Sequence, residues 1–504
     1  MINNTDIPSK ECRNLLSAIS NPHIVDDLLN KEVEKGFLQG PFDTPPFTKY
    51  RVSPIGVSFK KYSNKGRLIM DLSAPHSEAS DPSINSLIDK EKCSLSYVTT
   101  DDAIKIIQKL GLETTMCKTD ISDAFKLIPI SPSQWHLFLL KWKGLYYFYT
   151  KLAFGCRSSP RIFDCLAQAI CWIATHNYGI KHILHLLDDF ITFEEPEKCG
   201  ERNMALLMLI FKRLNIPIAK HKTEGPDTTI TFLGITLDSV KMEARLPPEK
   251  ISRIISFLDE FLQKKSCTKR ELLQILGHLS FASRVIVPGR SFVSQLITLS
   301  TSVKQLHFHV TLNKGSREDM NMWLIFLKQW NGISMFYNQI EVSSDALQLY
   351  TDASGTLGYG GFFQGRWFSE SWPLPLQRTC KDSDELSIAF RELYPIVVAA
   401  LLWGHSWRKQ RIVFSCDNQG TVAIINKGRS KCPKIMALVR RLTLCAANNN
   451  FVFKSKYFEG HKNVIADCLS RLQIPKFRQL VPAANKKSCT VPGYKEVLKD
   501  LTVL

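Results

Sequence analysis

Two adjacent aspartates, Asp188 and Asp189, are the residues of this chain whose spacing most clearly indicates chemistry. They interrupt an apolar run, residues 183–193, whose composition predicts two half-buried strands joined by a tight turn. Neighbouring carboxylates raise each other's pKa, and a divalent cation removes that cost. The pair therefore indicates half of a metal site, and the alternative interpretation is a polar hairpin turn.

A third carboxylate, Asp120, lies on a short predicted strand in Lys118-Thr119-Asp120. In a two-metal site, ions about 3.5–4 Å apart activate a hydroxyl and stabilise the leaving oxygen. Asp120, Asp188 and Asp189, called the first acid set below, would suit phosphoryl transfer from a nucleoside triphosphate.

Four further acids lie in predicted regular elements near the C-terminus. Asp352 lies in an alternating stretch, residues 347–363, that predicts two strands around a turn. Glu392 begins an apolar helix that runs to about residue 403, and Asp417 follows a buried strand. Asp467 lies in Ala466-Asp467-Cys468. Acids scattered through a basic protein would ordinarily be surface groups, which is the alternative interpretation for these four, called the second acid set.

The segments that carry these acids, together with several others, resemble in sequence and in order those of a reverse transcriptase with a C-terminal ribonuclease H domain. Such enzymes are carried by retrotransposons, and the resemblance is in particular to the DIRS-like group. The resemblance covers roughly residues 40–472. Each block alone is weak, but the ordered set is specific. The blocks of the polymerase part are residues 53–56, 67–73, 120–125, 152–163, 186–189 and 231–234.

For the polymerase part, the resemblance implies DNA synthesis on a primer by the first acid set, with Lys222 as the acid for the pyrophosphate leaving group. Phe125 would exclude ribonucleotides by crowding the sugar 2′ carbon. For Phe125 the alternative is a core residue, and for Lys222 it is a surface lysine. The implied nucleotide-binding residues are Lys61, Arg67, Ile121, Phe125, Phe154 and Gly155.

For the nuclease part, the resemblance implies that the second acid set binds two magnesium ions that orient a water against an RNA phosphate. Mg²⁺, with Mn²⁺ as the alternative, is expected at two ions in each active site. The chain departs from the family pattern at two positions. Tyr457 replaces a common His of the nuclease part, and Leu186 replaces a common Tyr before the two aspartates of the polymerase part. The implied metal-site residues are Asp120, Ile121, Asp188, Asp189, Asp352, Glu392, Asp417 and Asp467.

The implied partners are an RNA template, a DNA primer, an RNA–DNA hybrid and deoxynucleoside triphosphates. One rival hypothesis is a decayed or domesticated copy that binds nucleic acid without catalysis. Another is an enzyme with nuclease activity alone. Retention of every acid in both sets argues against these two rivals.

Composition agrees with a polyanionic partner. The 504 residues carry a formal net charge of +18, and lysines and arginines gain affinity by releasing counterions from phosphates. The 14 cysteines include no C-x-x-C pair, which favours a reduced, intracellular chain in the cytoplasm or nucleus. No apolar run reaches the roughly 18 residues of a membrane span, and no signal-peptide pattern begins the chain. The oligomeric state is left open.

These elements predict an α+β fold. The resemblance implies a right-hand polymerase of fingers, palm and thumb, followed by a connector and a ribonuclease H-like α/β domain. The expected ranges are a lead-in at 1–40, fingers and palm at 41–245, a helical thumb at 246–310, a connector at 311–345, the ribonuclease H-like domain at 346–472 and a basic tail at 473–504.

Overall fold

The computed structural model describes residues 6–59, 66–76, 82–198, 200–329, 333–336, 341–377 and 386–499. The chain divides into two compact units, Met1–Leu233 and Gly234–Leu504. The expected end of the palm at residue 245 therefore lies inside the second unit. Lys61, expected to bind nucleotide, lies outside the described residues.

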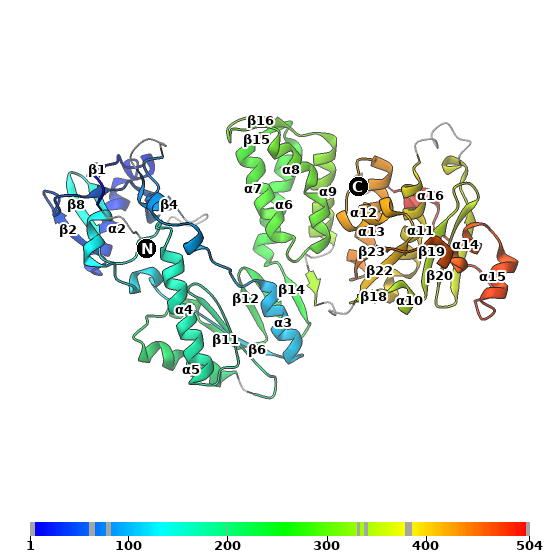
Figure 1. Cartoon of the computed structure of the whole chain (residues 1–504), viewed down its shortest axis with the longest axis horizontal. Coiled ribbons are helices and arrows are strands. Elements are labelled where there is room, and N and C mark those ends of the chain that lie inside the picture. The colour runs from blue at the N-terminus through cyan, green and yellow to red at the C-terminus, as the bar shows by residue number, and fades with distance from the viewer. Residues whose placement is uncertain are drawn as a thin grey trace. The chain divides into compact units, whose positions relative to one another are not determined.

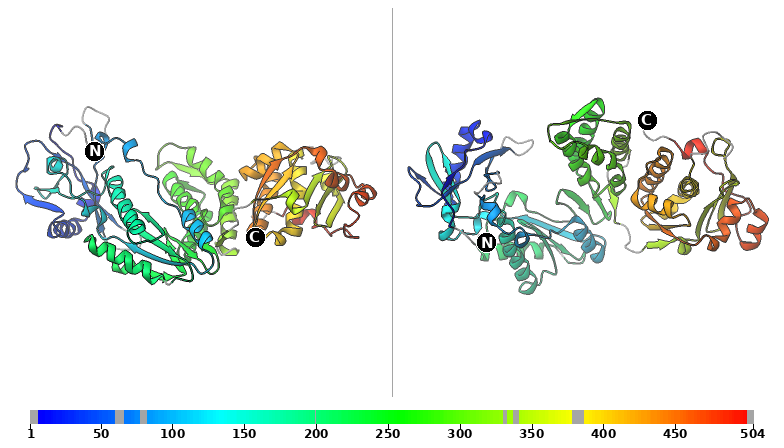
Figure 2. Two further views of the ribbon diagram at one scale, coloured as in Figure 1. Left: turned by 60° about the horizontal axis from the view of Figure 1, so that its bottom comes forward. Right: turned by 45° about the horizontal axis from the view of Figure 1, so that its top comes forward.

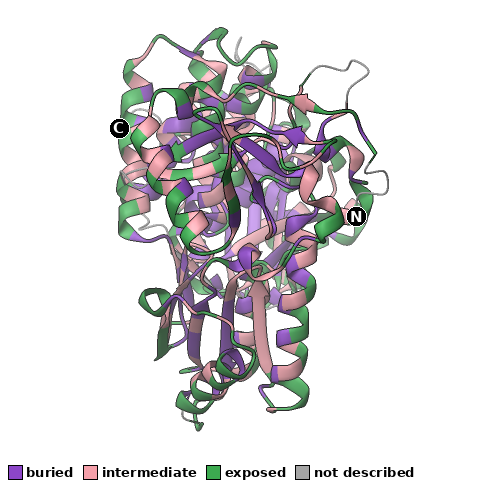
Figure 3. Ribbon diagram, turned by 90° about the vertical axis from the view of Figure 1, so that its left-hand side faces the viewer, coloured by how far each residue is buried: buried purple, intermediate pink, exposed green. Residues whose placement is uncertain are grey.

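A four-stranded antiparallel sheet forms the centre of the first unit (Figure 1). Its strands, in spatial order, are β11 (Glu224–Asp227), β6 (Thr115–Asp120), β10 (Asp189–Glu194) and β9 (His182–Leu186). The helices α4 (Ser159–His176) and α5 (Glu201–Arg213) pack on this sheet. Phe163, Ala167 and Ile170 of α4 are spaced as one helical face, and all three are buried. In Figure 3 buried residues, such as most of those of β6 and β10, are purple, whereas β9 is intermediate and β11 is exposed.

A second, five-stranded sheet and a hairpin complete the first unit. The sheet has the order β1 (Lys10–Glu11), β3 (Arg51–Val52), β7 (Leu139–Trp142), β8 (Leu145–Tyr149) and β2 (Leu38–Phe42). The remaining elements are α1 (Leu16–Ile19), α2 (Pro22–Glu34), the hairpin β4 (Ile55–Phe59) and β5 (Gly66–Met70), α3 (Thr100–Leu110) and β12 (Thr229–Phe232).

The second unit begins with a helical bundle (Figure 2, green). The capping box that the sequence indicates at Thr268 and Glu271 is confirmed, because both of its hydrogen bonds are present. The elements are β13 (Ile235–Asp238), β14 (Glu243–Arg245), α6 (Pro248–Gln263), β15 (Ser266–Thr268), α7 (Lys269–Ala282), α8 (Ser294–Thr301), β16 (His309–Thr311), α9 (Lys314–Gln329) and β17 (Ile333–Met335).

The rest of the second unit combines an antiparallel and a parallel three-stranded sheet. The first has the order β19 (Leu349–Ala353), β20 (Gly358–Phe363) and β21 (Arg366–Ser371). The second has the order β18 (Glu341–Ser343), β22 (Arg411–Cys416) and β23 (Val452–Tyr457). The helices are α10 (Ser344–Leu347), α11 (Ile388–Trp403), α12 (Gln419–Lys427), α13 (Pro433–Asn448) and α14 (Val464–Ser470).

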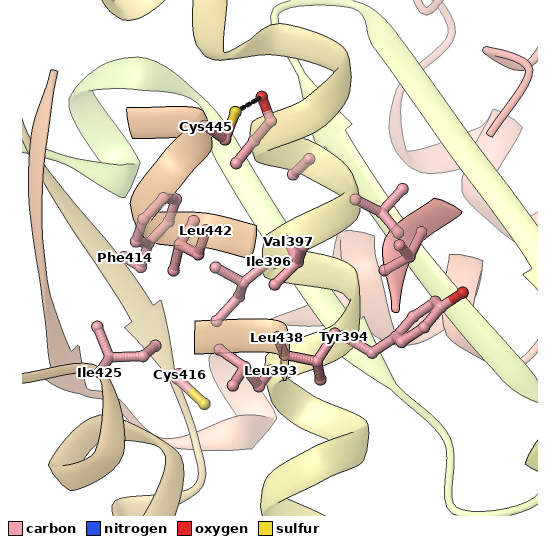
Figure 4. Packing of buried hydrophobic residues seen from close by; sticks show 14 of the residues in the cluster. Leu393, Tyr394, Ile396, Val397, Phe414, Cys416, Ile425, Leu438, Leu442 and Cys445 are labelled. Atoms are coloured by element: carbon pink, nitrogen blue, oxygen red, sulfur yellow. Dashed lines mark hydrogen bonds between the residues drawn. The ribbon is translucent and has the colours of Figure 1, made fainter. Parts of the chain in front are cut away.

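Helix α11 is the hydrophobic centre of this region (Figure 4). It contacts α13, β19 and β20, and its residues Leu393, Tyr394 and Val397 are fully buried. Among the described residues, the segment Ile388–Trp407 is long and apolar enough to cross a membrane, but 72% of its most apolar window is buried in the protein. Such burial is typical of a core helix, and the apolar helix that the sequence predicts from Glu392 to about residue 403 lies within this segment.

The segment expected as a basic tail packs on the same region as far as it is described. Its helices are α15 (Ile474–Leu480) and α16 (Tyr494–Val497). Phe477 of α15 is fully buried, with its ring 5.2 Å from that of Trp367. The Trp367 indole Nε1 donates a hydrogen bond to the carbonyl of Asn485 at 2.7 Å. These contacts make residues 473–499 part of the fold.

Candidate active sites

The first acid set lies at the ends of two paired strands. Strands β9 and β10 form the predicted hairpin, with a turn at Leu187 and Asp188 and with Asp189 opposite Leu186. Leu187 has a φ of +52°, in the left-handed region that a two-residue hairpin turn requires. Asp189 also pairs with Asp120 across β6 and β10. The register therefore places the three carboxylates at one edge of the central sheet.

These carboxylates are held close together, with Asp120 buried and Asp188 and Asp189 half-buried. Burial, a hydrogen bond with Asp120 and the negative charges of Asp120 and Asp188 raise the pKa of Asp189 to about 6. Burial and the charge of Asp120 also raise the pKa of Asp188. Asp120 itself is 5% exposed. The arrangement concentrates negative charge that a cation would neutralise.

Lys222 is the cation that the structure supplies to this set. Its Nζ lies 2.6 Å from Oδ2 of Asp120, and the lysine belongs to a short 3₁₀ turn, Lys220–Lys222. The backbone fixes this turn, because the amide of Ala219 donates to the carbonyl of Asp120 at 2.8 Å. The role that the resemblance implies for Lys222 stays a prediction: its side chain is 49% exposed, as in the alternative of a surface lysine, but its ammonium contacts a member of the first acid set.

Phe125 and Phe154 form an aromatic pair in the first unit, with ring centroids 5.0 Å apart. Phe125 also lies 5.7 Å from Phe163, and it is partly buried, whereas Phe154 is 51% exposed. Gly155 has a φ of +99°, and a Cβ there would lie 2.2 Å from the carbonyl oxygen of Met70. Only glycine fits this position, so the expected nucleotide-binding loop depends on it.

Asn85 braces this loop, and sequence analysis did not identify it. Its amide donates to the carbonyl of Gly155 at 2.9 Å, and its Oδ1 accepts from the backbone N–H of Arg157 at 2.8 Å. The Arg157 guanidinium donates to the carbonyl of Ile88 at 3.0 Å. That bond gives Arg157 a structural role. No local pattern around Asn85 could have indicated its role.

Two other residues expected at the nucleotide site, Arg67 and Ile121, lie on or next to strands outside this loop. Arg67 is exposed on β5, and its positive charge counts among the influences that lower the pKa of Asp188. Ile121 is buried, and its backbone N–H donates to the carbonyl of Asp188 at 3.0 Å. Ile121 thus ties β6 to the turn that carries the acids.

Lys126 is a second residue that sequence analysis missed. It is 3% exposed, its Nζ lies 3.1 Å from Glu32, and the same Nζ lies 3.6 Å from the ring centroid of Tyr149. Burial lowers the pKa of Lys126. A lysine inside the apolar run at residues 124–130 was the available sequence signal, since buried charges are rarely retained without a partner.

The second acid set comes from four elements of the second unit. Asp352 lies on β19, Glu392 on α11, Asp417 directly after β22 and Asp467 on α14. The fold brings them together: ligand atoms of Glu392 and Asp417 lie within 4.8 Å of each other, and the Ser470 hydroxyl contacts both the Asp352 carboxylate and the carbonyl of Asp467. Asp417 and Asp467 raise the pKa of Asp352, and Asp352 and Asp417 raise that of Glu392.

Burial is the main cause of these shifts. It raises the pKa of Asp352 to about 6 and that of Glu392 to about 9, and it also raises the pKa of Asp417. Two acids have partners: the Ser470 hydroxyl donates to Asp352, and Nε of Arg471 donates to Asp467 at 2.7 Å. Within the described residues, Glu392 has no hydrogen-bond or ion-pair partner.

One of the two departures noted in the sequence, Tyr457, lies at the margin of this region, whereas the other, Leu186, lies on β9 of the first unit, opposite Asp189. Tyr457 ends β23, opposite Cys416, and is 50% exposed. His461 lies in an exposed turn, 3.5 Å from Glu459. Gly460 approaches the acids, because a Cβ there would lie 2.7 Å from Oδ2 of Asp417.

Both acid sets fit divalent cations by the chemistry of their donors. Each combines several carboxylate oxygens, the preferred ligands of Mg²⁺ and Mn²⁺, in a partly buried position. The raised pKa values of Asp189 and Asp352 mark charge that the protein alone leaves uncompensated. Asp120, Asp188 and Asp189 would hold ions in the first unit, and Asp352, Glu392, Asp417 and Asp467 in the second.

Part of the chain matches a protein family model. Residues 48–237 match the family model of reverse transcriptase (RNA-dependent DNA polymerase). Two Drosophila melanogaster proteins, the retrovirus-related Pol polyproteins from transposons opus and 297, are each 22% identical, over 66% and 73% of this chain. The chain spans 32% of the length of each.

The solved structures give the fold. A foamy viral protease-reverse transcriptase in complex with an RNA/DNA hybrid matches with a TM-score of 0.51 and 14% identity. The match covers 90% of this chain and 56% of that chain. The predicted fold class, a right-hand polymerase of mixed helices and sheets, is confirmed.

Proposed function

We propose that this chain is an RNA-directed DNA polymerase that extends a DNA primer on an RNA or DNA template. One observation carries the proposal: Asp120, Asp188 and Asp189 converge at one sheet edge, inside the region that matches the reverse transcriptase model. The likeness to transposon Pol polyproteins supports an origin in a retroelement. A DIRS-like origin, and a place of action in the cytoplasm or nucleus, are part of the same proposal.

Bound to the first acid set, divalent cations, with Mg²⁺ proposed, would supply Lewis-acid activation of the primer hydroxyl and stabilisation of the leaving oxygen. Three side chains of the protein have the other roles in this proposal. Arg67 contacts the triphosphate of the incoming deoxynucleotide, which a guanidinium can bind in bidentate fashion. Lys222 gives its Nζ proton to the pyrophosphate oxygen. Phe125, held by Phe154 and Phe163, leaves no room for a 2′ hydroxyl.

Primer extension tests this proposal. The full chain, a labelled DNA primer on an RNA template, Mg²⁺ and the four deoxynucleotides should give extended product. Asp188→Asn should abolish extension, while Asp43→Asn, which changes an exposed acid of the same unit, should retain it. Hybrid binding without extension by the native chain would reject the polymerase and favour the rival hypothesis, a decayed or domesticated binding copy.

A second function is favoured by a separate observation. Four acids from four elements, Asp352, Glu392, Asp417 and Asp467, share one partly buried location in the second unit. We infer from this location that the second acid set cleaves the RNA strand of RNA–DNA hybrids, as in ribonuclease H. The acids would bind the cations, while Ser470 and Arg471 hold Asp352 and Asp467 in place.

Cleavage of labelled RNA within a hybrid tests this function. The native chain should release short RNA fragments, and Asp417→Asn should not. Asp345→Asn, which changes an exposed acid in the same unit, serves as the matched control. Equal cleavage by the native chain and Asp417→Asn would assign the activity to a contaminating nuclease and reject the second function.

A further inference from the structure

A thiol lies inside the second acid set. Strand β22 ends at Cys416, directly before Asp417, and one ligand atom each from Glu392, Cys416 and Asp417 lies within 4.8 Å of the others. Cys416 is 3% exposed. Figure 4 shows its sulfur at the end of the strand, on the side of the helix that carries Leu393. The neighbouring acid site therefore offers sulfur as well as oxygen.

Glu392 independently indicates a ligand at this place. It is 8% exposed, and within the described residues it has neither a hydrogen bond nor an ion pair. A buried carboxylate without a partner is costly, and potential ligand atoms of Cys416 and Asp417 lie within 4.8 Å of it. A cation shared by these three side chains would remove that cost.

We propose that Glu392, Cys416 and Asp417 bind Zn²⁺ as a mixed sulfur–oxygen site, and that this ion excludes Mg²⁺ and stops RNA cleavage. Mg²⁺ is bound by oxygen, whereas Zn²⁺ accepts cysteine sulfur at about 2.3 Å and carboxylate oxygen at about 2.0–2.2 Å. Donors within 4.8 Å of one another reach such an ion after small side-chain movements. Binding releases the thiol proton to the buffer as the zinc–sulfur bond forms.

Three protein donors leave one position of a tetrahedral zinc ion open to water. The ion occupies carboxylates that the proposed nuclease needs, so it competes with Mg²⁺. The inhibitory consequence rests on the proposed nuclease function. Occupancy of the site does not, and it can be measured without any substrate.

Co²⁺ provides the binding test, because a sulfur–cobalt bond gives a charge-transfer absorption in the near ultraviolet. The full chain is titrated with Co²⁺ and then with Zn²⁺, in parallel with two single-thiol variants. Cys416→Ser removes the proposed ligand. Cys445→Ser is the matched control, because Cys445 is a buried thiol of the same region whose Sγ donates to the carbonyl of Ala400 at 3.2 Å (Figure 4).

We expect Cys416→Ser to lose one equivalent of the cobalt–sulfur band and Cys445→Ser to retain it, with Zn²⁺ displacing Co²⁺ from the native chain. In cleavage assays at fixed Mg²⁺, Cys416→Ser should need at least about tenfold more Zn²⁺ for half inhibition. A band that persists in Cys416→Ser, or equal Zn²⁺ inhibition of both chains, overturns the proposal.

Two further outcomes separate the site from the nuclease. A Cys416-dependent band in a chain that cleaves no RNA keeps the zinc site and rejects the proposed nuclease. Cleavage without any such band rejects the zinc site alone. If thermal melting shows that Cys416→Ser does not fold, Glu392→Gln is the decisive variant, because it keeps the thiol and removes a carboxylate ligand. Unchanged Co²⁺ affinity in Glu392→Gln overturns the proposal.

Discussion

The two acid sets differ in how far apart along the chain their members lie and in how their charge is compensated. Two adjacent strands and one turn supply Asp120, Asp188 and Asp189. The second set draws on two strands and two helices between Asp352 and Asp467. The first set is thus assembled mainly by strand register, and the second by the packing of α11 and α14 against their sheets.

The two acid sets also differ in how nearby cationic side chains compensate their negative charge. The first set has Lys222 at 2.6 Å from Asp120, and burial with neighbouring charge raises the pKa of Asp189 to about 6. In the second set Arg471 pairs with Asp467, but burial raises the pKa of the unpartnered Glu392 to about 9. The second set therefore leaves more of its carboxylate charge without a cationic side chain, and it has a thiol beside it that the first set lacks among its described neighbours.

The largest expected effect is separation of the two activities. Asp189→Asn should lower primer extension by about 100-fold or more and leave RNA cleavage unchanged, because each cation ligand supplies several kcal/mol of transition-state stabilisation. Asp417→Asn should give the reverse pattern. Parallel extension and cleavage assays on each folded variant check this. Joint loss of both activities in either variant would contradict two independent sites.

The next largest effect is expected from Lys222, the lysine that contacts Asp120 of the first acid set. Lys222→Met should slow single-turnover nucleotide addition by about 100-fold, since a positioned general acid contributes at least that much. Lys220→Met, which changes an exposed lysine of the same turn, should retain the native rate. Rapid-quench measurement distinguishes rate from affinity. A weaker nucleotide affinity at an unchanged rate would show that Lys222 only binds phosphate.

A smaller effect is expected from the ring of Phe125. Phe125→Val should lower selection of deoxynucleotides over ribonucleotides by about tenfold or more, because it opens space at the sugar. The ratio of kcat/KM for the two nucleotide classes measures this. Extension with deoxynucleotides should change little, and an unchanged ratio would assign Phe125 to the core beside Phe154 and Phe163.

The smallest effect tests a buried carboxylate outside both sets. Asp319 is 1% exposed, accepts from the backbone N–H of Gln295 at 3.1 Å, and lies 3.8 Å from Arg440. Burial raises the pKa of Asp319 from 3.8 to about 7. Between these values the folded chain holds a proton that the unfolded chain has lost, so this residue's contribution to stability falls as pH rises from about 4 to about 7.

Asp319→Asn should therefore flatten the pH dependence of unfolding by an amount on the order of a few kcal/mol across that window. Thermal melting with EDTA at several pH values measures it. Added Mg²⁺ should not change the difference between this variant and the native chain, in contrast to variants of the acid sets. A difference that depends on Mg²⁺ would mean that Asp319 binds cations as well.

Local patterns in the sequence determined several elements of this protein on their own. An apolar run interrupted by two acids predicted the Asp188 hairpin, alternating apolar residues predicted the strand of Asp352, and the capping box predicted the start of α7. These features depend on neighbours within a few residues, where side-chain periodicity and backbone hydrogen bonding are decisive. The ordered blocks, through their resemblance, also predicted the fold class.

Only the tertiary structure decided which distant groups meet. Asn85 holds the loop of Gly155, and Lys126 lies against Glu32. The C-terminal segment covers Trp367 through Phe477. Cys416 shares a site with Glu392 because a strand end and a helix pack together. Such contacts arise from burial of residues far apart in the chain, and burial is a property of the packed whole that no local pattern records.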